Sequence, residues 1–386
     1  MNLKEREINE YLSVIASNLD ISDSMREKAE KSYKAVGKWL GDDDSDSEVK
    51  IMPQGSFYLG TVIKPVSDSD EYDIDLVCLL KNDRDKSNSY IKNVVGDRLK
   101  GHQKYKEMLD KEEGKRCWTL YYDEFHMDIL PCVPKEIVYK EPILTEIRLT
   151  HKISEGKYIP KYSNPYKYHA WFENCMRKQA DEKRKFYAER NNVDIAEIPL
   201  YRIKTPLQQA VQLLKRHRDI MYDSLSEERK ENAPISIIIT TLAALAYNNE
   251  DNVFDALKNI LSNMEKNIVR VNQKYEILNP VMQEENFADK WNENPQKAKE
   301  FFSWLDCAKK EILVKPFTEQ GLHTLERNLE GCFGENIVKR SFKQAGDNMR
   351  ILRENNSLYV DGLKGGLKSQ PSNTTKKVGG HTFFGK

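Results

Sequence analysis

The sequence predicts an α+β fold in which a mixed sheet is followed by a lobe of helices. Short apolar runs bounded by Gly, Pro and Asp-rich turns fill residues 49–133, a pattern typical of strands. Apolar residues at helical spacing mark residues 3–40 and recur from about residue 165 onwards. A chain of 386 residues is long enough for two packed lobes that share one cleft.

The N-terminal region is predicted as helix over residues 3–40 with a restart near Ser22, and the acidic loop GDDDSDSE follows at 41–48. LVCLL (76–80) is continuously apolar, so we expect the strand that contains it to be buried on both faces. The runs predicted as strands are VKIMP (49–53), GTVIKPV (60–66), YDIDLVCLL (72–80) and CWTLYYDEFHMDILPCV (117–133).

Helices are expected again in the second half of the chain. Thr205-Pro206 is a good helix start, because a threonine side chain caps free N–H groups and proline fits the first turn. Residues 361–386 lack periodicity and are rich in Gly, Lys, Ser and Thr, which predicts a disordered tail. The predicted helices cover 166–190, 205–222, 233–247, 252–266 and 296–314. We divide the chain into a core (1–200), a helical lobe (201–345) and a C-terminal segment, mostly disordered (346–386).

Composition limits the classes of partner. Lys+Arg and Asp+Glu are 61 each, so the net charge is zero, whereas a general nucleic-acid binder is usually basic. The six cysteines form no CxxC pair and no zinc-ligand spacing with histidine. The start of the chain is charged, unlike a signal peptide, and no apolar run approaches the ~20 residues of a membrane span. We therefore expect a soluble cytoplasmic protein with no membrane association and no stable DNA binding.

The strongest chemical signal is a pair of aspartates at the start of the run 72–80. Asp73 and Asp75 are two apart on a predicted strand, so their side chains point the same way. Like charges on a buried strand repel one another and are costly to desolvate, and Mg²⁺, which prefers carboxylate oxygens, relieves both problems. The alternative is a solvated turn, SDSDEYD, that ends at Asp73, because so short a motif also matches by chance.

Neighbouring residues favour the metal site. Gly55 and Ser56 precede the pair, and such a turn lets backbone N–H groups and a hydroxyl approach a triphosphate. A third acid, Asp128, lies on another predicted strand, with Phe125, Met127 and Ile129 on the opposite face by parity. His126 shares the face of Asp128, and we interpret it as a neighbour rather than a ligand, since magnesium sites favour oxygen.

Three carboxylates on adjacent strands suit two-metal phosphoryl transfer. Asp73 and Asp75 would bridge two Mg²⁺ ions, for which Mn²⁺ can substitute. Asp128 would complete the ion that holds the attacking hydroxyl and accept the proton of that hydroxyl.

The helical lobe carries candidate phosphate contacts. Lys215 and Arg218 lie on or beside the apolar stripe of the helix predicted at 205–222, and basic groups on an inward face need an anionic partner. For Lys215 we favour phosphate over a structural ion pair, and for Arg218 we favour the ion pair. Ser236 lies in the first turn of the next helix, where free N–H groups favour anions, and a plain cap-region role is equally open.

These residues together resemble the CD-NTase family, the bacterial relatives of the animal enzymes cGAS and oligoadenylate synthetase. The resemblance rests on PQGSFYLGT (53–61), EYDIDLVCLL (71–80) with MDILP (127–131), LLKRHRD (213–219) with PISIIITTLAALAY (234–247), and NPVMQEENFADKW (279–291).

The resemblance implies a polymerase-β-like nucleotidyltransferase core, a helical lobe that closes the cleft and an N-terminal bracing helix. It implies cyclic di- or trinucleotide synthesis from NTPs with release of pyrophosphate, in anti-phage CBASS defence. Position by position it implies that Gln54, Gly55 and Ser56 hold the triphosphate, that Asp73, Asp75 and Asp128 bind metal, and that Lys215 and Ser236 contact phosphate. The zinc-binding insertion of cGAS is missing from this sequence, which removes the main reason to expect activation by DNA.

Two other functions stay open at this point: a tRNA- or protein-directed nucleotidyltransferase, and a non-enzymatic nucleotide sensor. A further partner is implied by the family, some of whose operons encode a ubiquitin-transfer-like enzyme that grasps the C-terminus of the synthase. The tail ends in GGHTFFGK, where Phe383 and Phe384 offer an apolar grip before Gly385. Alternatively, these two rings fold back onto the surface of the protein.

Overall fold

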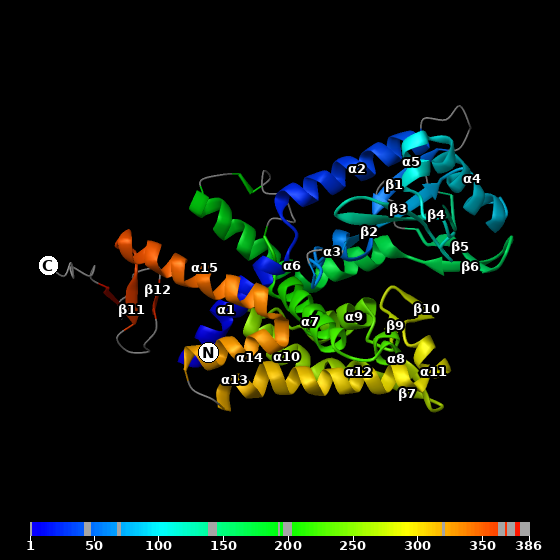
Figure 1. The fold of residues 1–386 in the computed structure, drawn as a ribbon. Helices are drawn as coiled ribbons and strands as arrows, with labels where there is room; N and C mark the ends of the chain where they lie inside the picture. Colours follow the sequence, from blue (N-terminus) through cyan, green and yellow to red (C-terminus); the bar gives the residue numbers. More distant parts are fainter. Residues whose placement is uncertain are drawn as a thin grey trace.

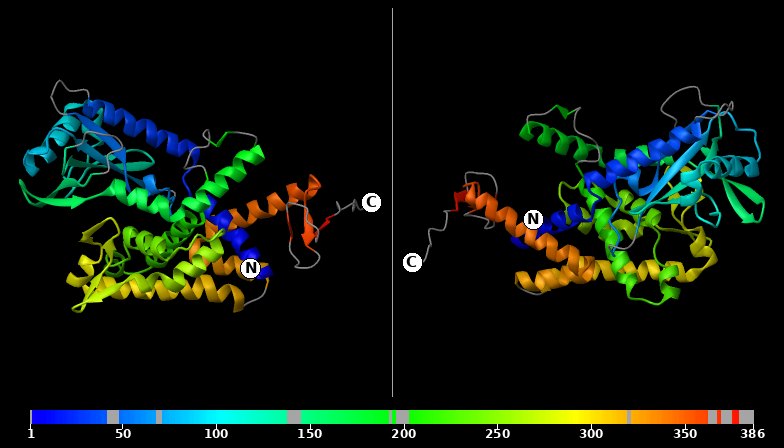
Figure 2. Two further views of the ribbon diagram at one scale, coloured as in Figure 1. Left: turned by 180° about the vertical axis from the view of Figure 1, so that it is seen from behind. Right: turned by 45° about the horizontal axis from the view of Figure 1, so that its top comes forward.

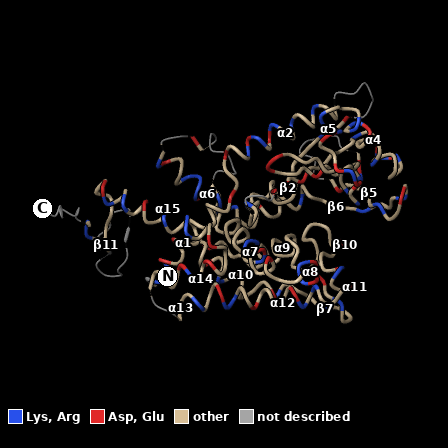
Figure 3. Tube along the Cα trace, in the orientation of Figure 1, with Lys and Arg blue, Asp and Glu red and all other residues tan. Residues whose placement is uncertain are grey.

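The computed structural model describes residues 2–41, 48–67, 71–137, 145–191, 194–195, 203–318, 321–361, 367–368 and 375–378. A sheet lobe and a helical lobe lie one above the other, with helix α6 (Pro165–Asn191) between them (Figures 1 and 2). Lys and Arg alternate with Asp and Glu along both lobes in the view of Figure 3. No helix among the described residues is long and apolar enough to cross a membrane.

The sheet lobe contains α2 (Asp23–Gly41), β1 (Val49–Pro53), α3 (Gly55–Leu59), β2 (Tyr72–Leu80), α4 (Asn88–Gly101), α5 (Gln103–Met108), β3 (Trp118–Tyr121), β4 (Phe125–Pro134), β5 (Ile147–Ser154) and β6 (Lys157–Ser163). The strand order is β1-β2-β4-β5-β6, and β3 pairs with β4. Strands β2 and β4 are parallel and the other pairs are antiparallel, so the predicted mixed sheet is confirmed.

The helical lobe contains α1 (Leu3–Leu19), α7 (Pro206–Asp223), α8 (Glu227–Glu231), α9 (Ser236–Ala246), α10 (Val253–Asn263), the 3₁₀ turn η2 (Met264–Asn267), α11 (Asp289–Glu293), α12 (Pro295–Ala308), the π-helical η3 (Lys309–Val314), α13 (Lys315–Thr318), α14 (Leu322–Phe333) and α15 (Glu335–Glu354). Short strands accompany these helices: β7 (Val269–Val271), β8 (Lys274–Glu276), β9 (Leu278–Asn279), β10 (Met282–Asn286), β11 (Tyr359–Asp361), β12 (Leu367–Lys368) and β13 (Thr375–Lys377).

The two faces of β2 are buried in two different hydrophobic clusters. Ile74, Leu76 and Cys78 point into a core shared with α2 and α4. Val77 and Leu79 point to the other face and pack with residues of β4, β5 and α6. The strand is therefore buried on both faces, as its apolar run predicts, and the second face is the one that continues towards the helical lobe.

The first two helices serve different lobes. The apolar stripe of α1 is buried in the helical-lobe core, where α1 contacts α7, α10 and α15, whereas α2 packs on β1 and β2. The predicted core over residues 1–200 therefore includes one helix that packs with the other lobe. The predicted boundary at 345 falls inside α15, which continues to Glu354.

One predicted strand is wrong. The run 60–66 forms no strand, and its backbone carbonyls are bound instead by side chains of α7. Gln212 donates to the carbonyl of Val62 at 2.8 Å, and Arg216 donates to the carbonyl of Lys64 at 2.7 Å. The hairpin of β5 and β6 went unpredicted, because its outer strand is polar and mostly exposed. Phe383, Phe384 and Gly385 lie outside the described residues.

Candidate active site

A tight turn places the Gly55-Ser56 motif over the acidic strand. Strand β1 ends at Pro53 opposite Leu76, and the Gln54 N–H donates to the carbonyl of Asp75 at 2.8 Å. Gly55 follows with φ of 59°, a left-handed conformation that glycine adopts without strain. Helix α3 begins here, so its free N–H groups lie beside the acids.

The strand register brings the three aspartates together. Because β2 and β4 run parallel, Asp75 lies opposite Asp128 and Asp73 lies opposite His126. Phe125, Met127 and Ile129 are fully buried on the other face, as the parity of β4 predicts. The acids therefore share the face that continues towards the helical lobe.

Each acid has a different environment. Asp73 is exposed, and its Oδ1 lies 2.8 Å from Nε2 of His126. Asp128 is half-buried and accepts a hydrogen bond from the Thr119 hydroxyl, on the adjacent β3, at 2.5 Å. His126 is thus an ion-pair partner of Asp73, and its expected absence from the metal ligands stays a prediction.

The electrostatics fit a cation site. Burial, reinforced by the nearby charges of Asp128 and Asp73, raises the pKa of Asp75 to about 7. The hydrogen bond to Asp73 raises the pKa of His126 to about 9, and the same bond lowers the pKa of Asp73. Three crowded carboxylates with one imidazolium partner leave negative charge that divalent cations, with their preference for carboxylate oxygens, would neutralise.

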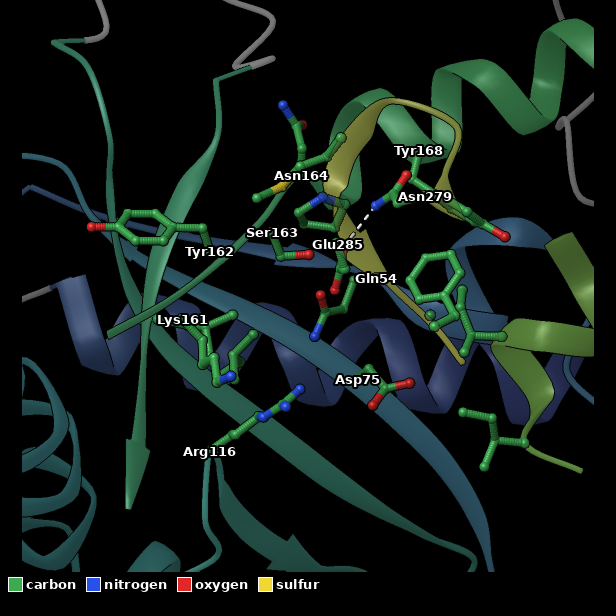
Figure 4. Close-up of a pocket in the computed structure, with 18 of the residues that line it drawn as sticks. Gln54, Asp75, Arg116, Lys161, Tyr162, Ser163, Asn164, Tyr168, Asn279 and Glu285 are labelled. Carbon is green, nitrogen blue, oxygen red and sulfur yellow. Dashed lines mark hydrogen bonds between the residues drawn. The ribbon is translucent and has the colours of Figure 1, made fainter. Parts of the chain in front are cut away.

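A cavity of about 760 Å³ opens beside Asp75 and Asp128 and is lined from both lobes. Tyr58 and His169 stack on its wall, with ring centroids 3.6 Å apart. Figure 4 shows other lining side chains from the two lobes: Arg116, Lys161, Tyr162, Asn164, Asn279 and Glu285. We call this space the large cavity.

A second, smaller pocket of about 160 Å³ adjoins Asp73. Its lining includes Ser56 from α3, Lys215 and Arg218 from α7, and Ser236 from α9. We call it the basic pocket. Its lining, which also includes residues 62–65, Glu71 and Asp219, comes from five separate segments that the tertiary fold brings together.

Comparisons with known proteins agree with this geometry. A family model described as Second Messenger Oligonucleotide or Dinucleotide Synthetase domain matches residues 7–173. The chain is 31% identical over 310 residues to a c-di-GMP synthase of Roseivirga ehrenbergii, covering 78% of this chain and 77% of that protein. The chain belongs to the CD-NTase family.

Solved CD-NTases share the fold. The CdnG enzyme of Bradyrhizobium diazoefficiens, solved with GTP, matches with a TM-score of 0.66 at 23% identity, over 88% of this chain and 99% of that one. The cyclic AMP-GMP synthase DncV of Vibrio cholerae matches with a TM-score of 0.54 at 14% identity, over 88% of each chain. A polymerase-β-like core with a helical lobe, as predicted, is therefore confirmed.

Membership of the CD-NTase family makes the chain a nucleotidyltransferase that synthesises cyclic nucleotides and uses divalent metal ions. The family also implies the predicted role in anti-phage defence. Of the three functions left open by the sequence, the comparisons support this one.

The phosphate contacts predicted on this CD-NTase's helical lobe have protein partners. Lys215 is buried, with its Nζ 3.0 Å from the carbonyl oxygen of Thr61, and burial, followed by the charge of Arg218, lowers the pKa of the ammonium to about 8. Arg218 pairs with Asp219 at 2.6 Å, as predicted, and also donates to the hydroxyl of Ser236 at 2.9 Å. The roles of Lys215 and Ser236 towards phosphate stay predictions.

Several residues of the site of this CD-NTase escaped sequence reasoning. Thr119 precedes the acid motif of β4 and carries no motif of its own. Glu285 and Asn279 lie within the block NPVMQEENFADKW, which marks the family but shows no periodicity that singles them out. Their place in the cavity depends on how β9 and β10 fold back towards the sheet.

A separate cluster lies in the helical lobe. The side chains of His217, Cys307 and Glu311 lie within 4.8 Å of one another. The carboxylate of Glu311 is already satisfied, since one oxygen lies 3.2 Å from Nε2 of His217 and the other accepts from Lys315 at 2.8 Å. We interpret this group as a structural ion network of α7 and η3.

Proposed function

We propose that this enzyme joins two nucleoside triphosphates, at least one of them GTP, into a cyclic dinucleotide with release of two pyrophosphates. The observation that carries the proposal is the register of Asp75 opposite Asp128 on parallel strands, beside a cavity lined from both lobes. The choice of guanine is supported by the relatives, one named a c-di-GMP synthase and one solved with GTP. The volume of the large cavity suits a nucleotide-sized ligand.

We propose that Asp73, Asp75 and Asp128 hold two Mg²⁺ ions. Bound there, the ions would activate the attacking hydroxyl and neutralise charge on the leaving pyrophosphate. Asp73 and Asp75 would bind both ions, and Asp128, oriented by Thr119, would bind the ion on the acceptor side and take the hydroxyl proton. His126 would release Asp73 when cations replace it as the charge partner.

The triphosphate would lie between the turn at Gly55 and the basic pocket. The free N–H groups at the start of α3 and the Ser56 hydroxyl would donate to phosphate oxygens, and Gln54 at the N-cap position would contact the nucleotide beside them. Lys215 and Ser236 would contact the distal phosphates from the helical lobe. This arrangement would close the two lobes around the donor nucleotide.

The direct test is incubation of the purified protein with NTPs and Mg²⁺ or Mn²⁺, without tRNA or protein acceptor, followed by mass spectrometry. A cyclic dinucleotide that contains guanine supports the proposal. Nucleotide products only when tRNA or a protein acceptor is added would overturn it.

We also propose that the tail, residues 361–386, is captured by a conjugating enzyme through Phe383 and Phe384. The support is compositional: a lysine- and glycine-rich segment that carries two adjacent aromatics beyond β13, the strand that pairs with β11. Removing residues 370–386 should spare basal synthesis and abolish a covalent adduct when the neighbouring operon genes are co-expressed. An adduct that persists without this segment would exclude the idea.

A further inference from the structure

Glu285 has an unusual position in the large cavity. It lies on β10, which pairs with β9 across a short turn, and it lines the cavity from the helical lobe, across from the acids of the sheet. The carboxylate is half-buried, and neither the metal site nor the basic pocket uses it. Burying part of a carboxylate whose hydrogen-bonding capacity is not filled costs folding free energy. This cost favours a functional role for the side chain.

The carboxylate of Glu285 is held in place by one oxygen. The Nδ2 of Asn279 donates to Oε2 of Glu285 at 2.7 Å, a bond drawn in Figure 4. Asn279 is itself only 2% exposed, and its Oδ1 accepts from the backbone N–H of Val281 at 3.1 Å. The amide therefore cannot swing away, and the carboxylate is oriented before any ligand binds.

The other oxygen is available to a ligand. Within the described part of the chain, Oε1 of Glu285 has no hydrogen-bond donor from the protein. Oε2 keeps a second lone pair beside the bond from Asn279. The two carboxylate oxygens are thus adjacent, negatively charged hydrogen-bond acceptors at the border of a cavity that is large enough for a nucleotide.

The other charged side chains of the cavity wall limit the chemical class of the ligand further. Burial raises the pKa of Glu285, and the hydrogen bond from Asn279 and the charge of Arg116, which lines the same cavity, oppose that rise. The side chain of Arg116 is positioned by a hydrogen bond from Nε to His151 at 3.3 Å. The wall, which also includes Lys161, Lys290, Glu284 and Asp289, therefore offers both carboxylate acceptors and cationic donors to one bound molecule.

Among the common bases, guanine fits this pair best. Its N1–H and 2-amino group are adjacent donors that match a carboxylate, and its O6 and N7 are acceptors that match an arginine. Adenine places an acceptor, N1, beside its amino group, and uracil flanks its single N–H with two carbonyls. A carboxylate repels these acceptors, so the same side chain would both attract guanine and reject the other bases.

We propose that Glu285, oriented by Asn279, recognises the N1–H and 2-amino edge of a guanine base in the large cavity and so selects GTP. The inference rests on the proposed function and deepens it by assigning base choice to one side chain. Arg116 supports the same base from its O6 and N7 side.

The test compares GTP with inosine triphosphate, which lacks only the 2-amino group, and with ATP. Steady-state kcat and KM are measured for wild type, Glu285→Gln and Glu285→Asp. The aspartate keeps the negative charge but, being one methylene shorter, moves the carboxylate away from the base. Glu276→Gln is the matched control, because it removes a half-buried carboxylate of β8 that does not line the cavity. Melting temperatures of all variants are recorded in parallel.

The KM of wild type for GTP should be lower than its KM for inosine triphosphate by a factor on the order of 10 or more, as expected for a charge-assisted hydrogen bond. Both Glu285 variants should reduce this preference to about 3-fold or less, with little change in kcat, and Glu276→Gln should keep it. A wild-type enzyme indifferent to the 2-amino group, or Glu285 variants that weaken GTP and ATP equally, would overturn the assignment.

Failure of the proposed function is distinguishable from failure of this inference. If wild type makes no nucleotide product with either metal, the proposed function fails, and calorimetric binding of GTP and inosine triphosphate to wild type and Glu285→Gln still tests the guanine contact. Equal affinity ratios in the two proteins would then contradict the role of Glu285.

Discussion

A Cβ atom placed on Gly55 would stand 2.1 Å from Oδ2 of Asp75. The glycine of the turn and the central acid of the site therefore lie in close contact, although helix α3 and a loop separate them in sequence. Because Gly55 also has a positive φ, two independent constraints exclude any larger residue at this position. The position of Asp75 and the left-handed backbone therefore require glycine at position 55.

Gly55→Ala should abolish synthesis, because the methyl group displaces the Asp75 carboxylate. It should also lower stability by ~1–2 kcal/mol through the left-handed backbone alone. Gly331→Ala in α14 is the control, since no atom lies within 4 Å of the Cβ it would add. Product formation and thermal melting measure the two effects, and an active Gly55→Ala protein would contradict the proposed site.

Thr119→Val should lower activity while leaving the fold intact. It removes the hydroxyl that orients Asp128 at nearly constant volume, and loss of such an outer partner typically costs ~10–100-fold in metal affinity or activity. Thr150→Val is the matched control, because the buried Thr150 hydroxyl has no recorded partner in the described chain. A loss of activity that higher Mn²⁺ fails to improve would show that Thr119 acts elsewhere.

Replacing Asp73 and Asp75 together with asparagine should abolish product, with a loss well beyond the ~10–100-fold of an outer-shell change. In metal-free buffer the double variant should melt at the same temperature as wild type or higher, because it removes charges that repel one another and Asp128. Full activity at saturating Mg²⁺ would exclude these acids as ligands.

Lys215→Ala should raise the KM for every NTP by a similar factor, on the order of 10–100-fold for a lost charge-assisted contact. Because Lys215 also anchors the carbonyl of Thr61, the control is Gln212→Ala, which removes a neighbouring anchor at Val62 without removing charge. A rise in KM of equal size in Gln212→Ala would show that Lys215 acts only by holding the segment 60–66 in place. An altered choice of base with unchanged KM would place it at a base.

Acid should destabilise the helical lobe through Glu311. The hydrogen bond from His217, with help from Lys315, lowers the pKa of this carboxyl from 4.5 to about 2. A carboxyl whose pKa is depressed on folding contributes stability above its unfolded pKa and loses it as pH falls from about 4.5 towards 2. Chemical unfolding at pH 7 and pH 3 should show this loss in wild type and a much smaller one in Glu311→Gln.

The control for that experiment is Glu335→Gln, whose pair with Lys339 is exposed and screened by solvent, so this variant should keep the pH dependence of wild type. If Glu311→Gln keeps the full pH dependence of wild type, another group is responsible for the acid sensitivity.

Much of the site follows from local rules of sequence. Period-two alternation puts Asp73 with Asp75, and sets Asp128 against the apolar residues of the same strand. The cap at Thr205 and the proline after it fix the start of α7, which forms a capping box with Gln208 as local chemistry dictates. These features depend on neighbours within a few residues, so the sequence determines them without knowledge of the fold.

Other features depend on segments far apart in the chain. That β2 and β4 pair in parallel, with Asp75 opposite Asp128, depends on the route of the chain through α4, α5 and β3. The run 60–66 has a strand-like pattern, yet donors on α7 some 150 residues later bind its carbonyls and remove it from any sheet. Lys215 contacts the carbonyl of Thr61, and Glu285 lines a cavity, only because the two lobes meet. Sequence by itself determined which residues are candidates for the chemistry. The tertiary structure decided which of them face one another, because register and lobe packing are set by contacts distant in sequence.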